Sequence, residues 1–233
     1  MIDRMDSESK IPNCVGVIMD GNRRWAKAKG LPTFAGHSKG RETLKEFLKY
    51  ARKAGVKHVI AFAFSLENWK RSPEEVSFLL ELMLKAFKEE RDEFIGEKAQ
   101  IRFAGDISRF PVDLQEAMKK LEEDTKQFKD MSLTLCVSYG GRDEIVTATN
   151  KCIADGITKV TEKDISEHLY TAGIPDPDIV IRTSGEMRLS GFLLWQSTYS
   201  ELFFTKTLWP DFSEEEFNKI LEEYSNRERR MGK

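Results

Sequence analysis

The stretch CVGVIMDGNRRWAKAKG, residues 14–30, passes from an apolar run straight into a dense group of polar side chains. The run CVGVIM (14–19) is typical of a strand in the interior of a sheet. Asp20 follows the strand directly and is close in sequence to Arg23 and Arg24. Either the stretch is a polar turn with a solvated charge cluster, or it is a site for a polyanion that is held through a metal ion.

The composition is that of an ordinary globular chain. Its 233 residues are enough for one large α/β domain with a sizeable core. Hydrophobic residues make up 40% and charged residues 33% of the chain, and the formal net charge is −2. No overall basic field therefore favours nucleic acid as a partner, and any affinity for anions must be local.

Three cysteines, Cys14, Cys136 and Cys152, lack the spacing of metal ligands, which argues against a zinc site. An odd number of cysteines, in a chain whose first ten residues are polar, indicates a reducing, cytoplasmic environment. The apolar runs are far shorter than a membrane span. We therefore expect no transmembrane helix, which leaves peripheral contact with a membrane open.

Strand-like and helix-like patterns alternate along the chain. The strand-like runs are 14–19, 58–64, 100–105, 133–139, 178–183 and 201–205, and the helical patterns are 38–53, 73–95, 111–128, 142–154, 161–171 and 213–226. This order predicts an α/β fold: a single domain with a mainly parallel central sheet of about six strands, covered by helices on both faces. We place a polar N-terminal segment at 1–11 and the domain at 12–233.

The 73–95 segment has the clearest helix start. Ser72 is a suitable N-cap, Pro73 suits the first helical position, and Glu75 would complete a capping box. Its apolar residues cover more than one stripe: Val76, Leu79, Leu80, Met83 and Phe87, extended by Phe78, Leu82 and Leu84. Either the helix is buried on two sides, or the second stripe lines a cavity for an apolar ligand.

Unusual polar residues follow the strands at their carboxyl ends. They are Asp20-Gly21-Asn22, Ser65-Leu66-Glu67-Asn68-Trp69, Gly105-Asp106, Tyr139-Gly140-Gly141-Arg142 and Arg182-Thr183-Ser184-Gly185-Glu186. Because open α/β sheets bind ligands at this rim, the coincidence predicts a site there.

The residue types at the rim suit phosphate groups. Guanidinium forks match phosphate oxygens, and glycines let backbone N–H groups approach an anion closely. The rim arginines are Arg23, Arg24, Arg71, Arg142, Arg182 and Arg188. Asp20 is the one acid inside the first basic cluster, which Mg²⁺ would explain, since that ion takes one or two carboxylates together with phosphate oxygens. Neither a P-loop nor a dinucleotide-binding glycine motif occurs.

Simpler explanations stay open for single residues. Asp20 could merely neutralise Arg24, and His37 could cap the next helix. Trp25 and Trp69 could be packing residues at the rim. Glu201 could be a surface acid at a strand start, and Ser190 a plain turn residue.

A series of motifs along the chain is more specific than any of these residues alone. They are MDGNRRWA (19–26), GH (36–37), FSLENWKR (64–71), YGGR (139–142), IRTSGEMRLSGFLLWQ (181–196), YSELFF (199–204) and WPDF (209–212). Together they resemble the cis-prenyltransferase family, above all the bacterial undecaprenyl diphosphate synthases, from about residue 12 to residue 232. The DDxxD metal motif of the trans enzymes is absent.

The resemblance implies a role for each matched position. Asp20 would hold Mg²⁺ and assist the departure of the allylic diphosphate, Asn68 would serve in proton removal, and Glu201 would assist the metal across a dimer interface. The implied substrate-binding residues are Gly21, Asn22, Arg23, Arg24, Trp25, His37, Ser65, Leu66, Glu67, Trp69, Arg71, Arg182, Arg188, Leu189 and Ser190. Arg230, Met231 and Gly232 resemble a tail that reaches a neighbouring subunit.

The chain departs from the family pattern at two positions. Thr33 stands where relatives usually have an arginine, and Arg23 stands where several relatives have glycine. We hypothesise that Arg23 compensates for Thr33.

The implied activity is repeated Mg²⁺-dependent condensation of isopentenyl diphosphate onto farnesyl diphosphate. The product would be a long polyprenyl diphosphate such as the undecaprenyl carrier of cell-wall synthesis. This chemistry requires a hydrophobic tunnel, for which the second stripe of 73–95 is the candidate wall. A homodimer in the cytoplasm, in peripheral contact with the inner face of the membrane, is also implied. The alternatives are a Mg²⁺-dependent phosphate-ester hydrolase and a non-catalytic prenyltransferase subunit.

Overall fold

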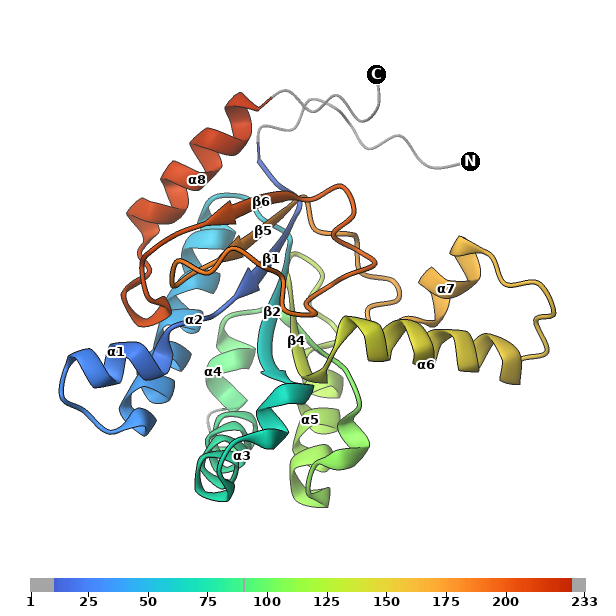
Figure 1. Ribbon diagram of the computed structural model, residues 1–233, viewed down its shortest axis with the longest axis horizontal. Coiled ribbons are helices and arrows are strands. Elements are labelled where there is room, and N and C mark those ends of the chain that lie inside the picture. Colours follow the sequence, from blue (N-terminus) through green and yellow to red (C-terminus); the bar gives the residue numbers. More distant parts are fainter. Residues whose placement is uncertain (1–10, 90, 228–233) are drawn as a thin grey trace.

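The computed structural model describes residues 11–89 and 91–227, and its centre is one six-stranded sheet (Figure 1). The strands are β1 (Cys14–Ile18), β2 (His58–Ser65), β3 (Gln100–Ala104), β4 (Ser132–Tyr139), β5 (Ile179–Arg182) and β6 (Glu201–Phe204). Their order is β3-β4-β2-β1-β5-β6, and all neighbours are parallel. The six predicted strands are confirmed. The division between residues 11 and 12 stays a prediction, because residues 1–10 lie outside the described part.

The first strand shows why the central run is apolar throughout. Val15 and Val17 point into the core on one face of the sheet, whereas Cys14 and Ile18 point into the core on the other. Gly16 lets Phe192 approach, since an added Cβ would come within 3.2 Å of that ring. A strand that is buried on both faces needs apolar side chains at even and odd positions.

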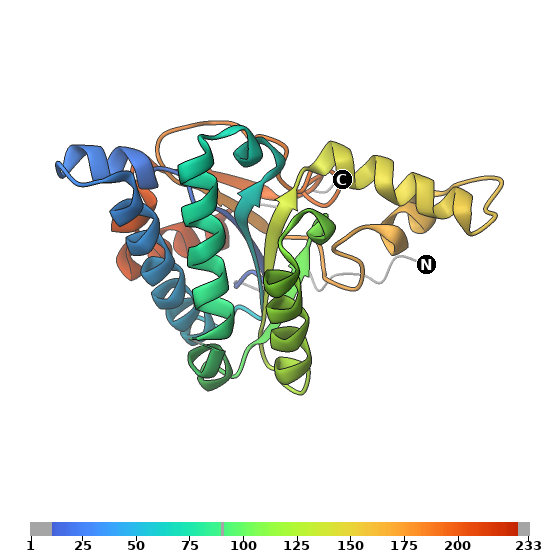
Figure 2. The ribbon, with the colours of Figure 1, turned by 90° about the horizontal axis from the view of Figure 1, so that it is seen from below.

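Helices cover the two faces unequally (Figure 2). The described α-helices are α1 (Asn22–Ala28), α2 (Thr33–Lys53), α3 (Pro73–Lys88), α4 (Arg91–Gly96), α5 (Val112–Thr125), α6 (Gly141–Ala154), α7 (Glu162–His168) and α8 (Glu214–Asn226). Figure 2 shows α2, α3 and α5 along one face and α6 and α7 on the other. Phe217 of α8 packs on Phe47 of α2, so α8 belongs to the first group. Phe192 and Leu193 of the segment after β5 also cover the second face.

The helices differ from the sequence prediction most clearly in three places. Helix α1 was not expected, and it begins after Gly21, which is in the left-handed conformation with φ 110°. Helix α2 begins at Thr33 rather than at residue 38, so His37 lies inside the helix and does not cap it. The predicted 73–95 helix is divided into α3 and α4.

Helix α3 is not buried on two sides. Ala86 and Phe87 are buried, but Leu79, Leu82 and Met83 are only half-buried. The apolar side chains of α3 therefore do not fill the space beside the helix. Among the described residues we find no helix that is long and apolar enough to cross a membrane.

The α1–α2 pair depends on a close backbone approach at Gly36. A Cβ added there would lie 2.0 Å from the carbonyl oxygen of Asn22 at the start of α1. Because the obstacle is backbone, the clash can be relieved only by moving α1, which carries Arg23 and Arg24.

We expect Gly36→Ala to lower the free energy of unfolding by about 2–3 kcal/mol, measured by urea denaturation. Gly96→Ala is the matched control, because a Cβ at that helical position meets nothing within 4 Å. Equal stability of the two variants would show that α1 does not need this contact.

Candidate active site

The carboxyl ends of β1 and β5 bring Asp20 and Arg182 together. Ile18 is in register with Arg182, and Asp20 follows two residues after Ile18. Arg182 Nη2 donates to Asp20 Oδ2 at 2.8 Å, although Arg182 is only 4% exposed. Thr183 accepts from the backbone N–H of Asp20 at 3.0 Å and donates to its carbonyl at 2.7 Å. The acid is therefore fixed at both its backbone and its side chain.

Asp20 is ionised at neutral pH. Burial alone would raise its pKa, but the hydrogen bond and charge of Arg182, with the charge of Arg24, outweigh burial and lower the pKa. Arg24 lies 3.9 Å from the other carboxylate oxygen of Asp20. Because Asp20 also pairs with Arg182, it does more than neutralise Arg24. Its partly exposed carboxylate is suited to a hard cation.

A polar pocket of about 800 Å³ opens beside Asp20. It is lined by Met19, Asp20, Gly21, Asn22, Arg23, Arg24, Lys27, Gly30, Leu31, Pro32, Thr33, His37 and Arg71. These residues come from the end of β1, from α1, from the start of α2 and from the segment before α3. The pocket therefore collects most of the first basic cluster, while Arg142 is exposed at the start of α6 and lines neither pocket described here.

Glu75 lies behind this pocket and is 8% exposed. Its Oε1 accepts from Arg71 Nη1 at 2.9 Å, contacts His37 Nε2 at 3.2 Å and is 3.9 Å from Arg23 Nε. The predicted capping box is only half formed: Ser72 accepts from the Glu75 N–H, but the Glu75 side chain turns inward to the cations. Glu75 thus connects α1, α2 and α3 through a single oxygen.

The segment Ser65–Arg71 at the end of β2 contains a short 3₁₀ helix, Leu66–Lys70, with Ser65 and Arg71 as its caps. Asn68 Oδ1 accepts from the Ser65 N–H at 3.1 Å. Trp69 donates to Ser138 at 3.0 Å and packs against Phe64 and Phe110. Leu66 and Asn68 are half-buried and Glu67 is exposed, and among these segment residues only Arg71 lines the polar pocket.

The segment after β5 surrounds Arg182. Arg182 Nη1 donates to Ser190 Oγ at 2.8 Å and to the carbonyl of Arg188. Arg188 pairs with Glu186, whose carboxylate is also 3.8 Å from Arg24 Nη1. Leu189 packs against the hydrophobic cluster that contains Cys14, Ile18 and Phe192. Arg188 and Ser190 therefore lie near Asp20 through Arg182, and Ser190 is more than a plain turn residue.

A buried polar network holds this segment in place. Glu144 is 1% exposed and accepts from Tyr139 and from Gln196. Gln196 also donates to Thr171 at 2.6 Å. A buried acid needs such donors, so the network fixes the far end of the segment that carries Ser190.

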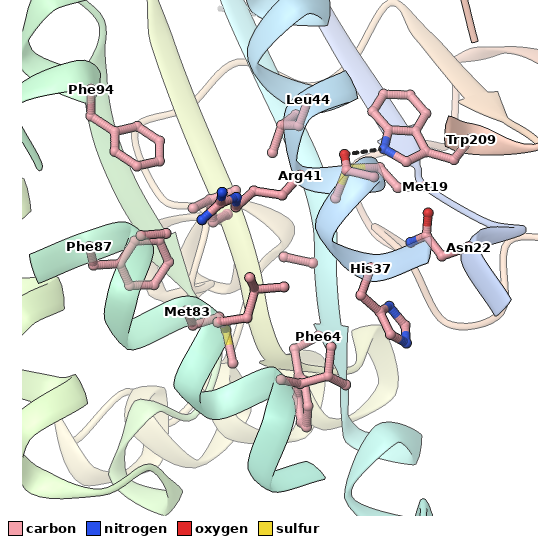
Figure 3. Close-up of a pocket in the computed structure, with 16 residues that line it drawn as sticks. Met19, Asn22, His37, Arg41, Leu44, Phe64, Met83, Phe87, Phe94 and Trp209 are labelled. Carbon is pink, nitrogen blue, oxygen red and sulfur yellow. Dashed lines mark hydrogen bonds between the residues drawn. The ribbon is translucent and has the colours of Figure 1, made fainter. Parts of the chain in front are cut away.

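An apolar cavity of about 120 Å³ lies between α2 and α3, next to the polar pocket (Figure 3). The cavity is lined by Met19, Asn22, His37, Gly40, Arg41, Leu44, Ala63, Phe64, Leu79, Leu82, Met83, Ala86, Phe87, Phe94, Leu135 and Trp209. Met19, Asn22 and His37 line both spaces. Leu79, Leu82 and Met83 show that both apolar stripes of α3 contribute to its wall.

The WPDF segment, residues 209–212, connects the end of β1 to α2 through the hydrogen bonds of Trp209. The backbone N–H of Trp209 donates to the Asp20 carbonyl at 3.0 Å, and its indole donates to the Gly40 carbonyl at 2.7 Å. Trp25 donates to Asp211 at 2.7 Å. These contacts, like those of Thr183 and Glu75, were not predicted, because hydrogen bonds between distant segments leave no local pattern.

Glu201 lies apart from Asp20 within the chain. It begins β6 in register with Ile179, whereas Asp20 follows the carboxyl end of β1. The two acids are separated by roughly 10 Å along the strand direction alone. Glu201 instead accepts from Arg227 at 2.6 Å. Arg230, Met231 and Gly232 lie outside the described residues.

No group of three or more His, Cys, Asp or Glu side chains suited to a metal ion occurs within the described residues. The donor set around Asp20 therefore suits a cation that arrives with phosphate oxygens and adds one protein carboxylate. It does not suit a cation caged by protein alone.

A cationic pocket beside an apolar cavity, at the rim of a parallel sheet, suits an enzyme that transfers an apolar group carried on a diphosphate. Comparison with known proteins agrees. A family model described as "Putative undecaprenyl diphosphate synthase" matches residues 18–232. The chain belongs to this family, the cis-prenyltransferases.

Individual relatives match over nearly the whole chain. The isoprenyl transferase of Fusobacterium nucleatum is 48% identical over 97% of this chain and 97% of its own, and that of Thermotoga maritima is 45% identical over 96% and 97%. The structure resembles lavandulyl diphosphate synthase from Lavandula x intermedia in complex with dimethylallyl diphosphate (TM-score 0.89, 36% identity, 96% of this chain and 99% of that chain). It also resembles a "probable undecaprenyl diphosphate synthase" from Campylobacter jejuni (TM-score 0.82, 33% identity, 95% and 99%).

Substitution of Glu75 tests whether this residue positions His37 and Arg71 in the polar pocket. Burial lowers the pKa of His37, and the hydrogen bond and charge of Glu75 act against this shift. We expect Glu75→Gln to lower the pKa of His37 further, which NMR titration can follow because the chain has only 3 histidines. We also expect roughly fivefold weaker binding of inorganic pyrophosphate by calorimetry, because Arg71 and His37 lose their common anchor, worth about 1 kcal/mol.

The matched control is Ser72→Ala, which removes the helix cap but keeps the carboxylate. Coulomb attraction alone predicts the opposite sign for Glu75→Gln, since the variant removes a negative charge from a basic cluster. Tighter pyrophosphate binding would therefore contradict the positioning role.

Proposed function

We propose that the protein condenses isopentenyl diphosphate repeatedly onto farnesyl diphosphate, with Mg²⁺, to give a long polyprenyl diphosphate. The family resemblance implies undecaprenyl diphosphate, the precursor of the lipid carrier of cell-wall synthesis. The observation that carries the proposal is that the polar pocket and the apolar cavity are neighbours, since Met19, Asn22 and His37 line both. A relative of TM-score 0.89 has a structure in complex with dimethylallyl diphosphate, another allylic diphosphate.

The polar pocket would receive the allylic diphosphate. Arg23, Arg24 and Arg71 provide guanidinium groups, and the N-terminus of α1 beside Gly21 adds backbone N–H donors. As the carbon–oxygen bond breaks, negative charge grows on the leaving diphosphate. Fixed cations at the leaving oxygens favour this step, and one such donor is typically worth about 3 kcal/mol in the barrier.

Asp20 would hold Mg²⁺ together with the diphosphate oxygens, and the ion would neutralise the developing charge as a Lewis acid. Arg182 keeps the Asp20 carboxylate ionised and aimed at the rim. Glu201 would take part only from a second copy of the chain, because it lies away from Asp20 in its own chain. The proposed role of Glu201 and the proposed homodimer therefore stand together.

Arg182, Arg188 and Ser190 would bind isopentenyl diphosphate. Its double bond then attacks the allylic carbon, and a proton leaves the adduct. Asn68 is a very weak base, so we propose that it orients a phosphate oxygen or a water that accepts the proton. For this role the segment Ser65–Arg71 must release the Ser65–Asn68 hydrogen bond and close over the substrate.

The growing chain would enter the apolar cavity. Burial of each CH₂ group is worth about 0.8 kcal/mol, so the hydrophobic effect draws the product inward. We propose that the protein works in the cytoplasm and touches the inner face of the membrane when it releases this lipid.

The decisive experiment is mass spectrometry of the products formed from farnesyl and isopentenyl diphosphates. We expect polyprenyl diphosphates with Mg²⁺ and none after chelation. Asp20→Asn should reduce turnover roughly 100-fold or more, because the metal contact and the Arg182 pair are both lost. Asn68→Ala should also reduce turnover, and a near-normal rate would exclude both proton-transfer roles for Asn68.

The same assay separates the alternatives. A phosphate-ester hydrolase would release phosphate or pyrophosphate without forming carbon–carbon bonds. A non-catalytic subunit would form no product alone, yet this chain keeps Asp20 and the arginines that such a subunit does not need.

Substitution of Arg23 tests whether this residue compensates for the threonine at position 33. Both residues line the polar pocket, and Arg23 is 61% exposed. If Arg23 compensates for Thr33, Arg23→Gly should raise the KM for the allylic diphosphate roughly fivefold, which corresponds to about 1 kcal/mol. Arg23→Ala is the matched variant that keeps the helix propensity of α1. An unchanged KM in both would reject compensation.

A further inference from the structure

Positive charge is concentrated at one end of the molecule, in residues 21–41. This segment forms α1 and the start of α2, and it contains six Lys or Arg residues and no Asp or Glu. Because the formal net charge of the whole chain is −2, setting these six positive charges aside leaves −8 for the rest. Part of the charge lines the polar pocket, but Lys29 and Lys39 are exposed and line neither pocket described above. Diphosphate binding therefore does not account for all of it.

Two large apolar side chains are exposed in the same segment. Leu31 is 44% exposed, lies in the turn between α1 and α2, and donates its N–H to the carbonyl of Ala26 at 2.9 Å. Phe34 is 41% exposed, although one side of its ring packs on Phe78 of α3. Figure 1 and Figure 2 both show α1 and this turn at one end of the molecule. A single exposed apolar residue is ordinary, but here two of them share a stretch of six residues with the exposed Lys29.

The combination of cations and exposed apolar side chains matches the surface of an anionic bilayer. Lipid phosphates attract Lys and Arg within a Debye length of the membrane, and apolar side chains gain by entering the region where headgroups meet acyl chains. A polynucleotide would satisfy the cations alone and would leave Leu31 in water. The observations therefore favour a lipid surface over a nucleic acid.

We propose that residues 27–34, the docking turn, bind the protein to an anionic lipid bilayer, with Leu31 and Phe34 inserted and Lys29 beside the lipid phosphates. The inference rests on the proposed function and names the surface through which that function meets the membrane. Since Leu31 also lines the polar pocket, docking places the mouth of this pocket beside the bilayer. An amphiphilic diphosphate can then pass between bilayer and pocket without carrying its whole prenyl chain through water.

The test is co-sedimentation of the full-length protein with vesicles, without any diphosphate substrate. One set of vesicles contains phosphatidylcholine alone, and the other contains equal parts of phosphatidylcholine and phosphatidylglycerol. We expect at least tenfold tighter binding to the second set, and we expect this preference to shrink as salt is added, because salt screens the attraction.

Variants of the docking turn separate the two contributions. Lys29→Glu should weaken binding to the anionic vesicles roughly tenfold, because attraction becomes repulsion. Leu31→Ser should weaken it roughly threefold and Leu31→Trp should strengthen it, because the inserted apolar surface shrinks in one and grows in the other. The matched controls are Lys119→Glu and Val112→Ser on α5, where both residues are exposed and Val112 is 69% exposed. These two variants should bind like the wild type.

Several results would overturn the inference. Equal binding of the wild type, Lys29→Glu and Leu31→Ser would remove the docking turn from any contact with lipid. Weakening by Lys29→Glu with no effect of Leu31→Ser or Leu31→Trp would reveal a plain polyanion site, as for a nucleic acid. A wild type that binds vesicles as expected but forms no carbon–carbon bond would reject the proposed function and leave the docking turn in place. A wild type that elongates prenyl chains but binds neither set of vesicles would reject the docking turn alone.

Discussion

The ion pair between the buried Arg182 and the partly exposed Asp20 is the interaction on which the site depends. Arg182 is almost fully buried, and a buried guanidinium without a partner would be strongly unfavourable. The parallel pairing of β1 with β5 places the two residues side by side, and a shift of one residue would turn either side chain to the other face. The register of two central strands therefore fixes the acid, the buried cation and, through Ser190 and Arg188, the segment after β5.

The fold keeps an apolar space open next to this charged rim. A helix in a well-packed core buries its whole apolar surface, yet Leu79, Leu82 and Met83 of α3 remain half-buried. The contacts that join α2 to α3 near the rim are the pairs His37–Glu75 and Phe34–Phe78, with ring centroids 4.4 Å apart in the second pair. Helix α2 is thus held at the rim by these two pairs and further along by Phe47, which packs against Tyr50, Trp209, Phe212 and Phe217. The region between α2 and α3 is left for a ligand.

The sequence predicts the sheet well because most strands are short apolar runs between polar turns, β1, β2, β4 and β5 above all. It predicts the helices less well where their ends are set by distant contacts. Helix α1 lacks an apolar stripe, and its start needs the unusual backbone of Gly21 rather than a capping side chain. Glu75 has the right position for a capping box, but two guanidinium groups and the imidazole of His37 turn it inward. Local patterns therefore identify the rim residues, and only tertiary contacts show which of them share a pocket.

Asn68 and the segment around it show how such a site can stay both ordered and ready to move. The Ser65–Asn68 hydrogen bond is a local contact, and a net bond of this kind contributes about 1 kcal/mol. Trp69 is held more firmly, by Phe64, Phe110, Ser138 and the guanidinium of Arg109 over its ring. The tryptophan can thus act as a fixed point while Asn68 and Arg71 on either side of it reorient. Since an ion pair with a diphosphate is stronger than the hydrogen bond that Asn68 would give up, substrate binding could supply the free energy for the proposed closure.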